Sequence, residues 1–219
     1  MTSKTAMLRT FQRRLLAWYR AHKRDLPWRR SRDPYHILVS EIMLHQTQVD
    51  RVAPKYEEFL AKYPTVHALA KAPLTALKKT WYPLGYNYRP ARLRTIARES
   101  IAKYNGKIPD SYYALIAMDG IGRYTAGAIL SFAYRQDAPT LDTNVARVLS
   151  RLFGVRGDLA KAPAQQRLWR LAAAVIPKGQ GYDFNQAMMD FGSAVCTARA
   201  PRCLVCSMKN ICRAYPVGP

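Results

Sequence analysis

The chain has 219 residues, 49% of them hydrophobic, which is enough for one sizeable domain or two small lobes without disulfide bonds. Lysine and arginine number 35 against 14 acidic residues, so the formal net charge is +21. The charge is spread along the chain and not gathered in one tail, which indicates a folded basic surface that meets a polyanion. A nucleic acid is the first candidate partner, and an anionic membrane surface is the second.

The sequence predicts neither a membrane-spanning helix nor a targeting signal. No apolar run approaches the roughly 20 residues that a membrane-spanning helix needs, and residues 1–14 are polar and basic. We therefore expect an intracellular protein, cytoplasmic and associated with the nucleoid, that does not enter a membrane. Cysteines in that compartment stay reduced, which favours metal ligation over disulfide bonds.

Apolar residues recur at helical spacing along the chain, beginning with Phe11, Leu15 and Tyr19. The same spacing returns in residues 93–104 and 145–152. No long alternating strand and no βαβ rhythm interrupts these stripes, so we expect an all-α fold. Proline steps separate intervals of one or two helices, at residues 33–34, 72–73, 108–109 and 138–139.

Glu41 is the first candidate for chemistry, because it lies between the apolar residues 37–39 and 42–44. Such neighbours exclude water from a carboxyl group, raise its pKa and let it act as a general acid near neutral pH. The alternative is a carboxylate on an amphipathic helix face that pairs with one of the many arginines.

A glycine-rich turn follows in the middle of the chain. Gly120 and Gly122 flank Ile121, and Arg123 precedes the small-residue segment 125–132. Glycines let backbone N–H groups approach a phosphate, and the start of a helix adds a positive dipole end. This pattern is typical of a helix–hairpin–helix that grips the DNA backbone without reading its sequence. An ordinary helix-to-helix turn is the alternative.

Asp142 stands at an expected helix start, where an aspartate can serve simply as an N-cap. The second possibility is a catalytic pair with Glu41. In N-glycosidic cleavage one carboxylic acid protonates the departing base, and an ionised carboxylate stabilises the oxocarbenium-like sugar.

The four cysteines all lie in the last 24 residues, at Cys196, Cys203, Cys206 and Cys212. Their spacing, C-x6-C-x2-C-x5-C, lacks the paired C-x2-C knuckles of most zinc sites. The looser spacing suits a group larger than one ion, so it favours an iron–sulfur cluster over zinc, with unligated cysteines the least favoured. Four basic residues nearby indicate a structural or DNA-docking role.

Together these segments resemble the helix–hairpin–helix DNA glycosylase superfamily (endonuclease III-like), and within it the A/G-specific adenine glycosylases. The resemblance covers nearly the whole chain and implies that the cysteines hold a [4Fe-4S] cluster. The motifs that carry it are residues 26–29 (LPWR), 33–35 (DPY), 40–49 (SEIMLHQTQV), 84–86 (LGY), 120–127 (GIGRYTAG), 141–148 (LDTNVARV), 184–190 (FNQAMMD) and the four cysteines.

The resemblance implies a role for each candidate residue. Glu41 is expected to protonate adenine at N7, and Asp142 to stabilise the cationic sugar with help from Asn144 and Tyr124. The target base is extruded from the duplex, because its glycosidic bond is otherwise hard to reach. The remaining expected positions are Gln46 and Tyr86 in the wedge, Trp28, Arg29, Leu44 and Gln186 in the base pocket, and Gly120, Gly122 and Arg123 on the DNA backbone.

Three departures from the family pattern matter. Bifunctional relatives such as endonuclease III place a lysine where this chain has Tyr124, so we expect a monofunctional hydrolase that uses water and does not cut the strand. His45 replaces the first glutamine of a Gln-Gln-Thr-Gln-Val stretch, and Asn87 replaces a tyrosine, so we expect a different wedge. The sequence ends shortly after Cys212, where full-length adenine glycosylases carry an 8-oxoguanine-recognition domain, so we expect weak discrimination for the oxidised base.

The expected protein is a base excision repair enzyme that removes adenine opposite guanine or 8-oxoguanine and leaves an abasic site. Its nearest rival is a T/G (U/G) mismatch thymine glycosylase of the same superfamily. The amide of Gln186 favours adenine, since it can pair with an adenine edge. A non-catalytic DNA-binding module would not need both Glu41 and Asp142.

The expected architecture has two helical lobes with a DNA-binding cleft between them. Residues 26–137 would form a six-helix barrel with the helix–hairpin–helix, and residues 1–25 and 138–219 would form the [4Fe-4S] cluster lobe. The expected partner is double-stranded DNA containing a mismatch, bound by a monomer.

Overall fold

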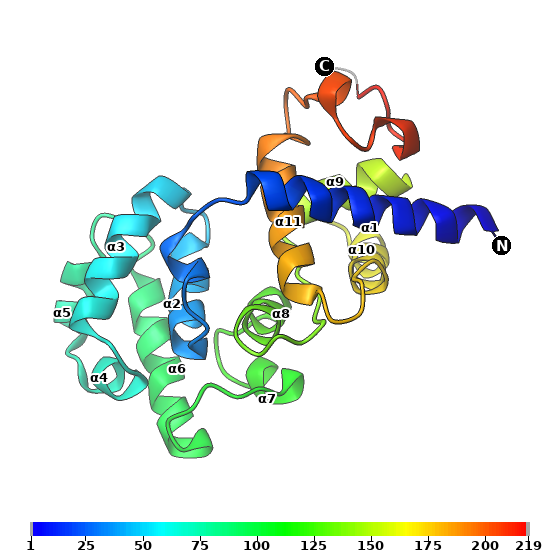
Figure 1. Cartoon of the computed structure of the whole chain (residues 1–219). Coiled ribbons are helices and arrows are strands. Elements are labelled where there is room, and N and C mark those ends of the chain that lie inside the picture. The colour runs from blue at the N-terminus through cyan, green and yellow to red at the C-terminus, as the bar shows by residue number, and fades with distance from the viewer. Residues whose placement is uncertain (1, 218–219) are drawn as a thin grey trace. The chain divides into compact units, whose positions relative to one another are not determined.

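The computed structural model describes residues 2–217. Within these residues every regular element is a helix and no strand occurs, which confirms the all-α class (Figure 1). None of the described helices is long and apolar enough to cross a membrane.

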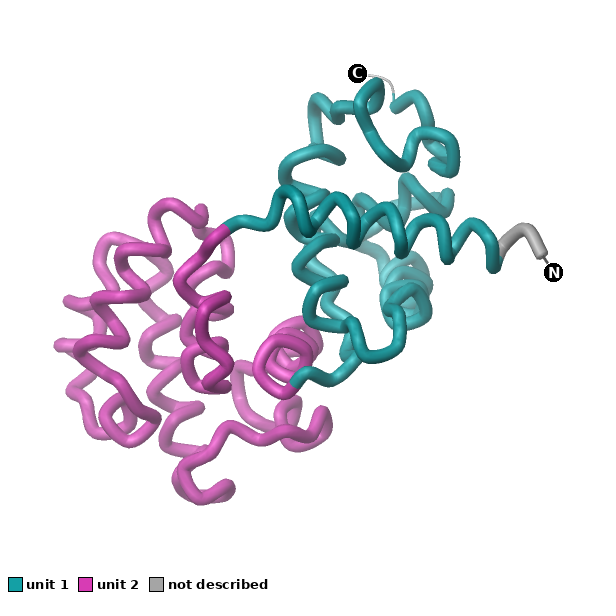
Figure 2. Tube along the Cα trace, in the orientation of Figure 1, with its two compact units in different colours: residues 1–24, 135–219 teal, residues 25–134 magenta. Residues whose placement is uncertain are grey.

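The chain divides into two compact units, coloured separately in Figure 2. Unit 1 comprises residues 1–24 and 135–219, and unit 2 comprises residues 25–134. The sequence-based prediction drew the boundaries at residues 26 and 137. Glu41 and the glycine hairpin thus belong to unit 2, whereas Asp142 and the cysteines belong to unit 1.

Unit 2 is built around α2, which carries Glu41 and contacts α3, α6 and α8. Asp33 caps this helix by accepting a hydrogen bond from the backbone N–H of Tyr35, and Pro34 at the first helical position is already in helical φ. All eight residues 125–132 of α8 are buried beside it. The elements of unit 2 are η1 (Pro27–Arg29), α2 (Pro34–Leu44), α3 (Val49–Lys62), α4 (Val66–Lys71), α5 (Leu74–Trp81), α6 (Tyr88–Tyr104), α7 (Tyr112–Ile116) and α8 (Arg123–Phe132).

Unit 1 forms around α11, which contacts α1 and α9. Phe11 of α1 lies edge-to-face with Phe153 and with Phe184, the ring centroids being 5.7 Å apart in both pairs. The first stripe read from the sequence therefore faces the core of this unit. Its elements are α1 (Thr2–His22), α9 (Thr143–Phe153), α10 (Ala162–Ala174), α11 (Gly181–Ala194), η2 (Cys203–Val205) and η3 (Lys209–Ile211).

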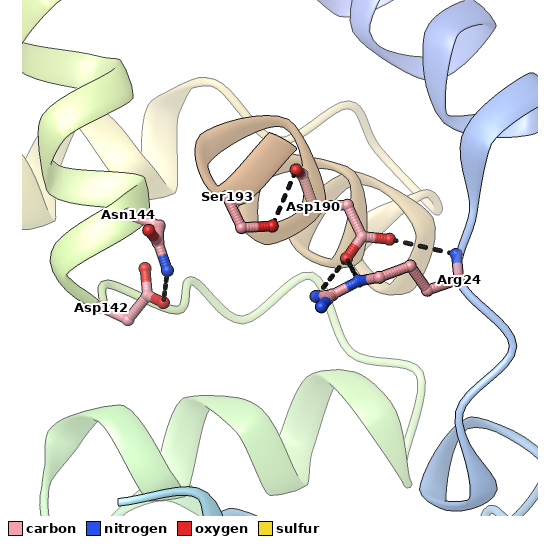
Figure 3. Close-up of polar contacts among 5 residues, drawn as sticks. All are labelled: Arg24, Asp142, Asn144, Asp190 and Ser193. Atoms are coloured by element: carbon pink, nitrogen blue, oxygen red, sulfur yellow. Dashed lines mark hydrogen bonds and ion pairs between the residues drawn. The ribbon is translucent and has the colours of Figure 1, made fainter. Parts of the chain in front are cut away.

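Arg24, just beyond α1, is tied to α11 through Asp190 (Figure 3). The guanidinium lies 2.7 Å (Nε) and 2.6 Å (Nη2) from Asp190 Oδ1, and the backbone N–H of Arg24 donates to Oδ2 at 3.4 Å. The Asp190 side chain is 2% exposed and that of Arg24 is 40% exposed. This ion pair anchors the chain at the place where it leaves unit 1.

Replacing Asp190 with asparagine should lower the free energy of unfolding by about 2–3 kcal/mol, because the Arg24 guanidinium loses its anionic partner next to a buried amide. The loss is smaller than for a fully buried ion pair, since Arg24 is partly exposed to solvent. Urea denaturation of both proteins measures the difference. Asp25→Asn is the control, since the side chains of the Asp25–Arg30 ion pair are both exposed (74% and 62%). This pair should make no measurable contribution to the free energy of unfolding. Equal losses in the two variants would contradict the anchoring role.

Candidate active site

Glu41 lies in the last full turn of α2 and is 4% exposed. Its neighbours Ile42 and Met43 are fully buried, as are Leu38 and Val39 on the preceding turn. A carboxyl group in this setting is shielded from water on a rigid element, which is what a proton donor in catalysis requires.

The chain leaves α2 at Leu44 and turns sharply at Gln46, which is exposed and has a φ of +55°. Tyr86, in the loop before α6, also has a positive φ of +48° and is 49% exposed. Positive φ is costly for residues with a Cβ, so both positions depend on support from their surroundings. Both residues predicted to act as wedges thus project from strained turns of unit 2.

His45, the departure from the family pattern, is half-buried and faces the hairpin. Its ring centroid lies 6.4 Å from that of Tyr124. Burial lowers the pKa of His45 below 6.5, and the nearby Arg89 and Arg92 lower it further. The imidazole that faces Tyr124 is therefore uncharged at neutral pH.

The depressed pKa of His45 predicts a pH dependence of stability. The unfolded chain binds the proton near pH 6.5 and the folded chain only at lower pH, so stability is complete above 6.5 and falls as the pH drops below it. His45→Gln should reduce that slope by up to about one proton per molecule. Urea denaturation at pH values on both sides of 6.5 measures it, and an unchanged slope in the variant would contradict the assignment.

The glycine hairpin joins α7 to α8, which contact each other. Gly120 has a φ of +90°, and a Cβ there would lie 2.3 Å from Cδ of Arg92, so this position needs glycine. Gly122 caps α8 in extended conformation, and Gly122 and Arg123 are both exposed. The N–H groups at the start of α8 therefore face solvent beside a cation, as an anion-binding helix start does.

Asp142 is the N-cap of α9 and uses both carboxylate oxygens; Figure 3 shows its contact with Asn144. Oδ1 accepts from the backbone N–H of Val145 at 2.7 Å, and Oδ2 accepts from Asn144 Nδ2 at 3.1 Å. The predicted helix start is confirmed. The second oxygen has an orienting partner that a simple cap does not require.

Arg147 connects Asn144 to the backbone at Cys196. The sequence did not single out this residue. Its Nη2 donates to Asn144 Oδ1 at 2.7 Å and to the Gly192 carbonyl at 2.7 Å. Its Nε donates to the Cys196 carbonyl at 2.7 Å. In a chain with 35 lysines and arginines no local pattern distinguishes this one.

The four cysteines are free thiols and all are half-buried. Burial raises the pKa of the Cys206 and Cys212 thiols, and each also senses the charge of Cys196 and Cys203. Arg151 Nη1 approaches Cys196 Sγ at 3.5 Å. Among the described residues, no three His, Cys, Asp or Glu side chains are placed so as to hold a metal ion.

The other predicted pocket residues lie in both units. Trp28 in η1 is 5% exposed and lies edge-to-face with Tyr56 at 5.7 Å. Arg29 and Leu44, also in unit 2, are half-buried. Gln186 on α11 of unit 1 is 4% exposed. Within unit 2 the structure brings His45 to the Tyr124 ring, and within unit 1 it brings Asn144 to Asp142.

Known proteins resemble this chain along most of its length. A model of the HhH-GPD superfamily base excision DNA repair protein matches residues 39–174. The adenine DNA glycosylase of Rattus norvegicus is 39% identical over 97% of this chain, and the thymine/uracil-DNA glycosylase of Methanothermobacter thermautotrophicus is 34% identical over 94% of it. The structure of a thermostable thymine-DNA glycosylase superposes with a TM-score of 0.91 at 33% identity, covering 97% of this chain and 98% of the other.

The matches differ in how much of each relative they cover. The chain spans 43% of the length of the rat adenine glycosylase and 94% of the Methanothermobacter enzyme. The family model alone covers more than half of the chain and includes Glu41, the hairpin and Asp142. The chain therefore belongs to the HhH-GPD superfamily of base excision DNA repair proteins.

Proposed function

We propose that this protein is a monofunctional mismatch DNA glycosylase that hydrolyses the N-glycosidic bond of adenine opposite guanine or 8-oxoguanine and leaves an abasic site. The observation that carries the proposal is the contrast between its two carboxyl groups. Glu41 is buried on α2 among apolar side chains, whereas Asp142 accepts hydrogen bonds at both oxygens. An acid and a carboxylate in contrasting environments suit glycosidic cleavage.

In the proposed reaction both groups act on one extruded nucleotide. Glu41 gives its proton to the base as the C1′–N bond breaks, and the bonding electron pair leaves with the base. The Asp142 carboxylate, oriented by Asn144, stabilises the positive charge on the sugar. Water adds to C1′ and its proton returns to the enzyme. Tyr124 has no amine for a Schiff base, so the strand stays intact.

The DNA contacts are proposed for the exposed parts of unit 2. The hairpin glycines and Arg123 would hold a phosphate, and Gln46 and Tyr86 would enter the duplex. Trp28, Arg29, Leu44 and Gln186 are proposed to contact the extruded base. A net charge of +21 supports binding to double-stranded DNA, which should weaken with added salt.

A [4Fe-4S] cluster is proposed for the cysteines on the chemistry of the donor set, although the described side chains do not converge on a metal position. Four half-buried thiols within 17 residues supply the Cys₄ ligation that such clusters use. The residues that would hold it are Cys196, Cys203, Cys206 and Cys212. When bound it would order the C-terminal loop, because residues 195–217 contain only two short 3₁₀ helices in the described chain.

The purified protein should be yellow-brown and contain about four irons per chain. Cys203→Ser should lose most of the iron and the visible absorption, with a lower melting temperature. Metal analysis and absorption spectra measure this, and Ser207→Ala within the same loop is the control. A colourless protein that contains zinc would overturn the assignment.

Thymine or uracil opposite guanine is the second candidate substrate. It is supported by the Methanothermobacter relative, matched along 94% of its length, and by the close fit to a thymine glycosylase structure. The higher identity to the adenine enzyme and the buried Gln186 amide support adenine.

A panel of duplexes holding A:G, A:8-oxoguanine, T:G and U:G decides between these substrates. Each is incubated with the protein, and abasic sites are then cleaved with alkali. We expect product from the two adenine duplexes. Product from T:G and U:G alone would replace adenine by thymine, and strand breaks without alkali would contradict the monofunctional assignment.

A further inference from the structure

Arg89, at the start of α6, is 1% exposed, although arginine side chains are mostly exposed in folded proteins. A buried guanidinium is retained only where acceptors surround it. Here six oxygen atoms do so, and they come from two separate segments of unit 2.

The first segment is the end of α2. Nη1 donates to the carbonyls of Ile42 at 3.1 Å, Met43 at 2.8 Å and His45 at 2.6 Å. These carbonyls lie in the last turn, where a helix has no internal donors and where a cation is favourable. Arg89 thus caps the helix that carries Glu41.

The other terminal nitrogen of the guanidinium, Nη2, contacts the loop after α2 and a second loop before α6. Nη2 donates to Thr47 Oγ1 at 3.0 Å and to the carbonyls of Leu84 at 2.9 Å and Gly85 at 3.2 Å. We name these segments the Gln46 loop (residues 45–48) and the Tyr86 loop (residues 82–87). One planar, five-donor group therefore joins both loops.

The acceptors lie directly beside the two strained residues. His45 and Thr47 flank Gln46, and the Gly85 carbonyl precedes Tyr86, whose own carbonyl accepts from the Arg89 N–H at 2.9 Å. The guanidinium also lies 5.2 Å from the centroid of the Tyr86 ring. Each positive φ is thus held by contacts to one side chain.

We infer that Arg89 is a positioning residue that holds the Gln46 loop and the Tyr86 loop as a single unit, so that both side chains enter a DNA duplex together. The inference rests on the proposed function for its use, whereas the coupling of the loops is a property of the free protein. Separate support for each loop would let one side chain move without the other.

Hydrogen exchange of the 219-residue protein tests the coupling. Arg89→Lys keeps the charge, but a lysine cannot reach acceptors in both loops from one ammonium group. Amide exchange in both loops should accelerate together by at least about tenfold. Thr47→Val, which removes one acceptor, should give a smaller rise in both loops. Arg98→Lys is the control, since Arg98 lies on the same helix and donates to the Ala70 carbonyl at 3.1 Å, outside both loops.

Base opening tests the use of the coupling. A duplex with 2-aminopurine in place of the target adenine should brighten as the base leaves the stack, and Arg89→Lys should reduce that rise by at least about tenfold while Arg98→Lys matches the original protein. Faster exchange in one loop alone or in neither, or base opening unchanged in Arg89→Lys, would overturn the inference. If Arg89→Lys does not fold, Thr47→Val carries both measurements. If the original protein opens no base, the proposed function falls, and exchange still decides whether Arg89 couples the loops.

Discussion

Replacing Glu41 with glutamine should slow base excision by about 10²–10⁴-fold, the usual contribution of a general acid. Glutamine has the same shape and accepts burial on α2, where the side chain is 4% exposed, but it has no acidic proton for the leaving base. Single-turnover excision measures the chemical step, and a binding titration on the same duplex measures affinity. We expect the rate to fall and the affinity to stay.

Glu57→Gln is the matched control for this experiment. Glu57 is an exposed carboxylate on α3 of the same unit, so its replacement is the same chemical substitution and touches no proposed catalytic group. Its excision rate should equal that of the original protein. If Glu41→Gln excised the base at full rate, the acid would have to be another residue. If the original protein bound mismatched DNA but released no base, the non-catalytic binding module would be the better interpretation.

Replacing Asp142 with asparagine should lower the excision rate by about 10²–10³-fold, the size typical of losing one electrostatic contact to a charged transition state. Asparagine is as good an N-cap as aspartate, so α9 should still begin at Thr143. The negative charge that we propose to stabilise the sugar cation is lost. Single-turnover kinetics give the rate, and a melting curve verifies the fold.

Asp158→Asn controls for the loss of an aspartate that accepts from a backbone N–H. Asp158 Oδ1 accepts from the Ala160 N–H at 2.9 Å and is exposed. This variant should retain both activity and melting temperature. If Asp142→Asn melted below the assay temperature, the loss of activity would follow from unfolding. Asp142 would then be a structural cap.

The local structure of unit 1 and unit 2 was largely predictable. The apolar stripes of residues 93–104 and 145–152 fall on α6 and α9, and the glycine hairpin joins α7 to α8. Helices follow from spacing within a few residues, and caps such as Asp33 and Asp142 follow from side chains that reach their own backbone. The family itself was readable because several long motifs occur in the right order.

The long-range contacts of three arginines were not predictable. Arg24, Arg89 and Arg147 look like any other basic residue in a sequence with 35 lysines and arginines. Their partners lie far along the chain: Arg89 contacts carbonyls more than 40 residues away on α2, and Arg147 contacts Cys196. Backbone carbonyls carry no sequence signature, so no pattern could identify these contacts.

Residue types at short spacing were enough to predict the all-α class and the superfamily, and to name two candidate carboxylates and four candidate cysteine ligands. The folded structure was needed to see which cations are buried, that Gln46 and Tyr86 have positive φ, and that His45 lies beside Tyr124 with a lowered pKa. Burial and backbone conformation depend on segments far apart in the chain, and folding alone brings those segments together.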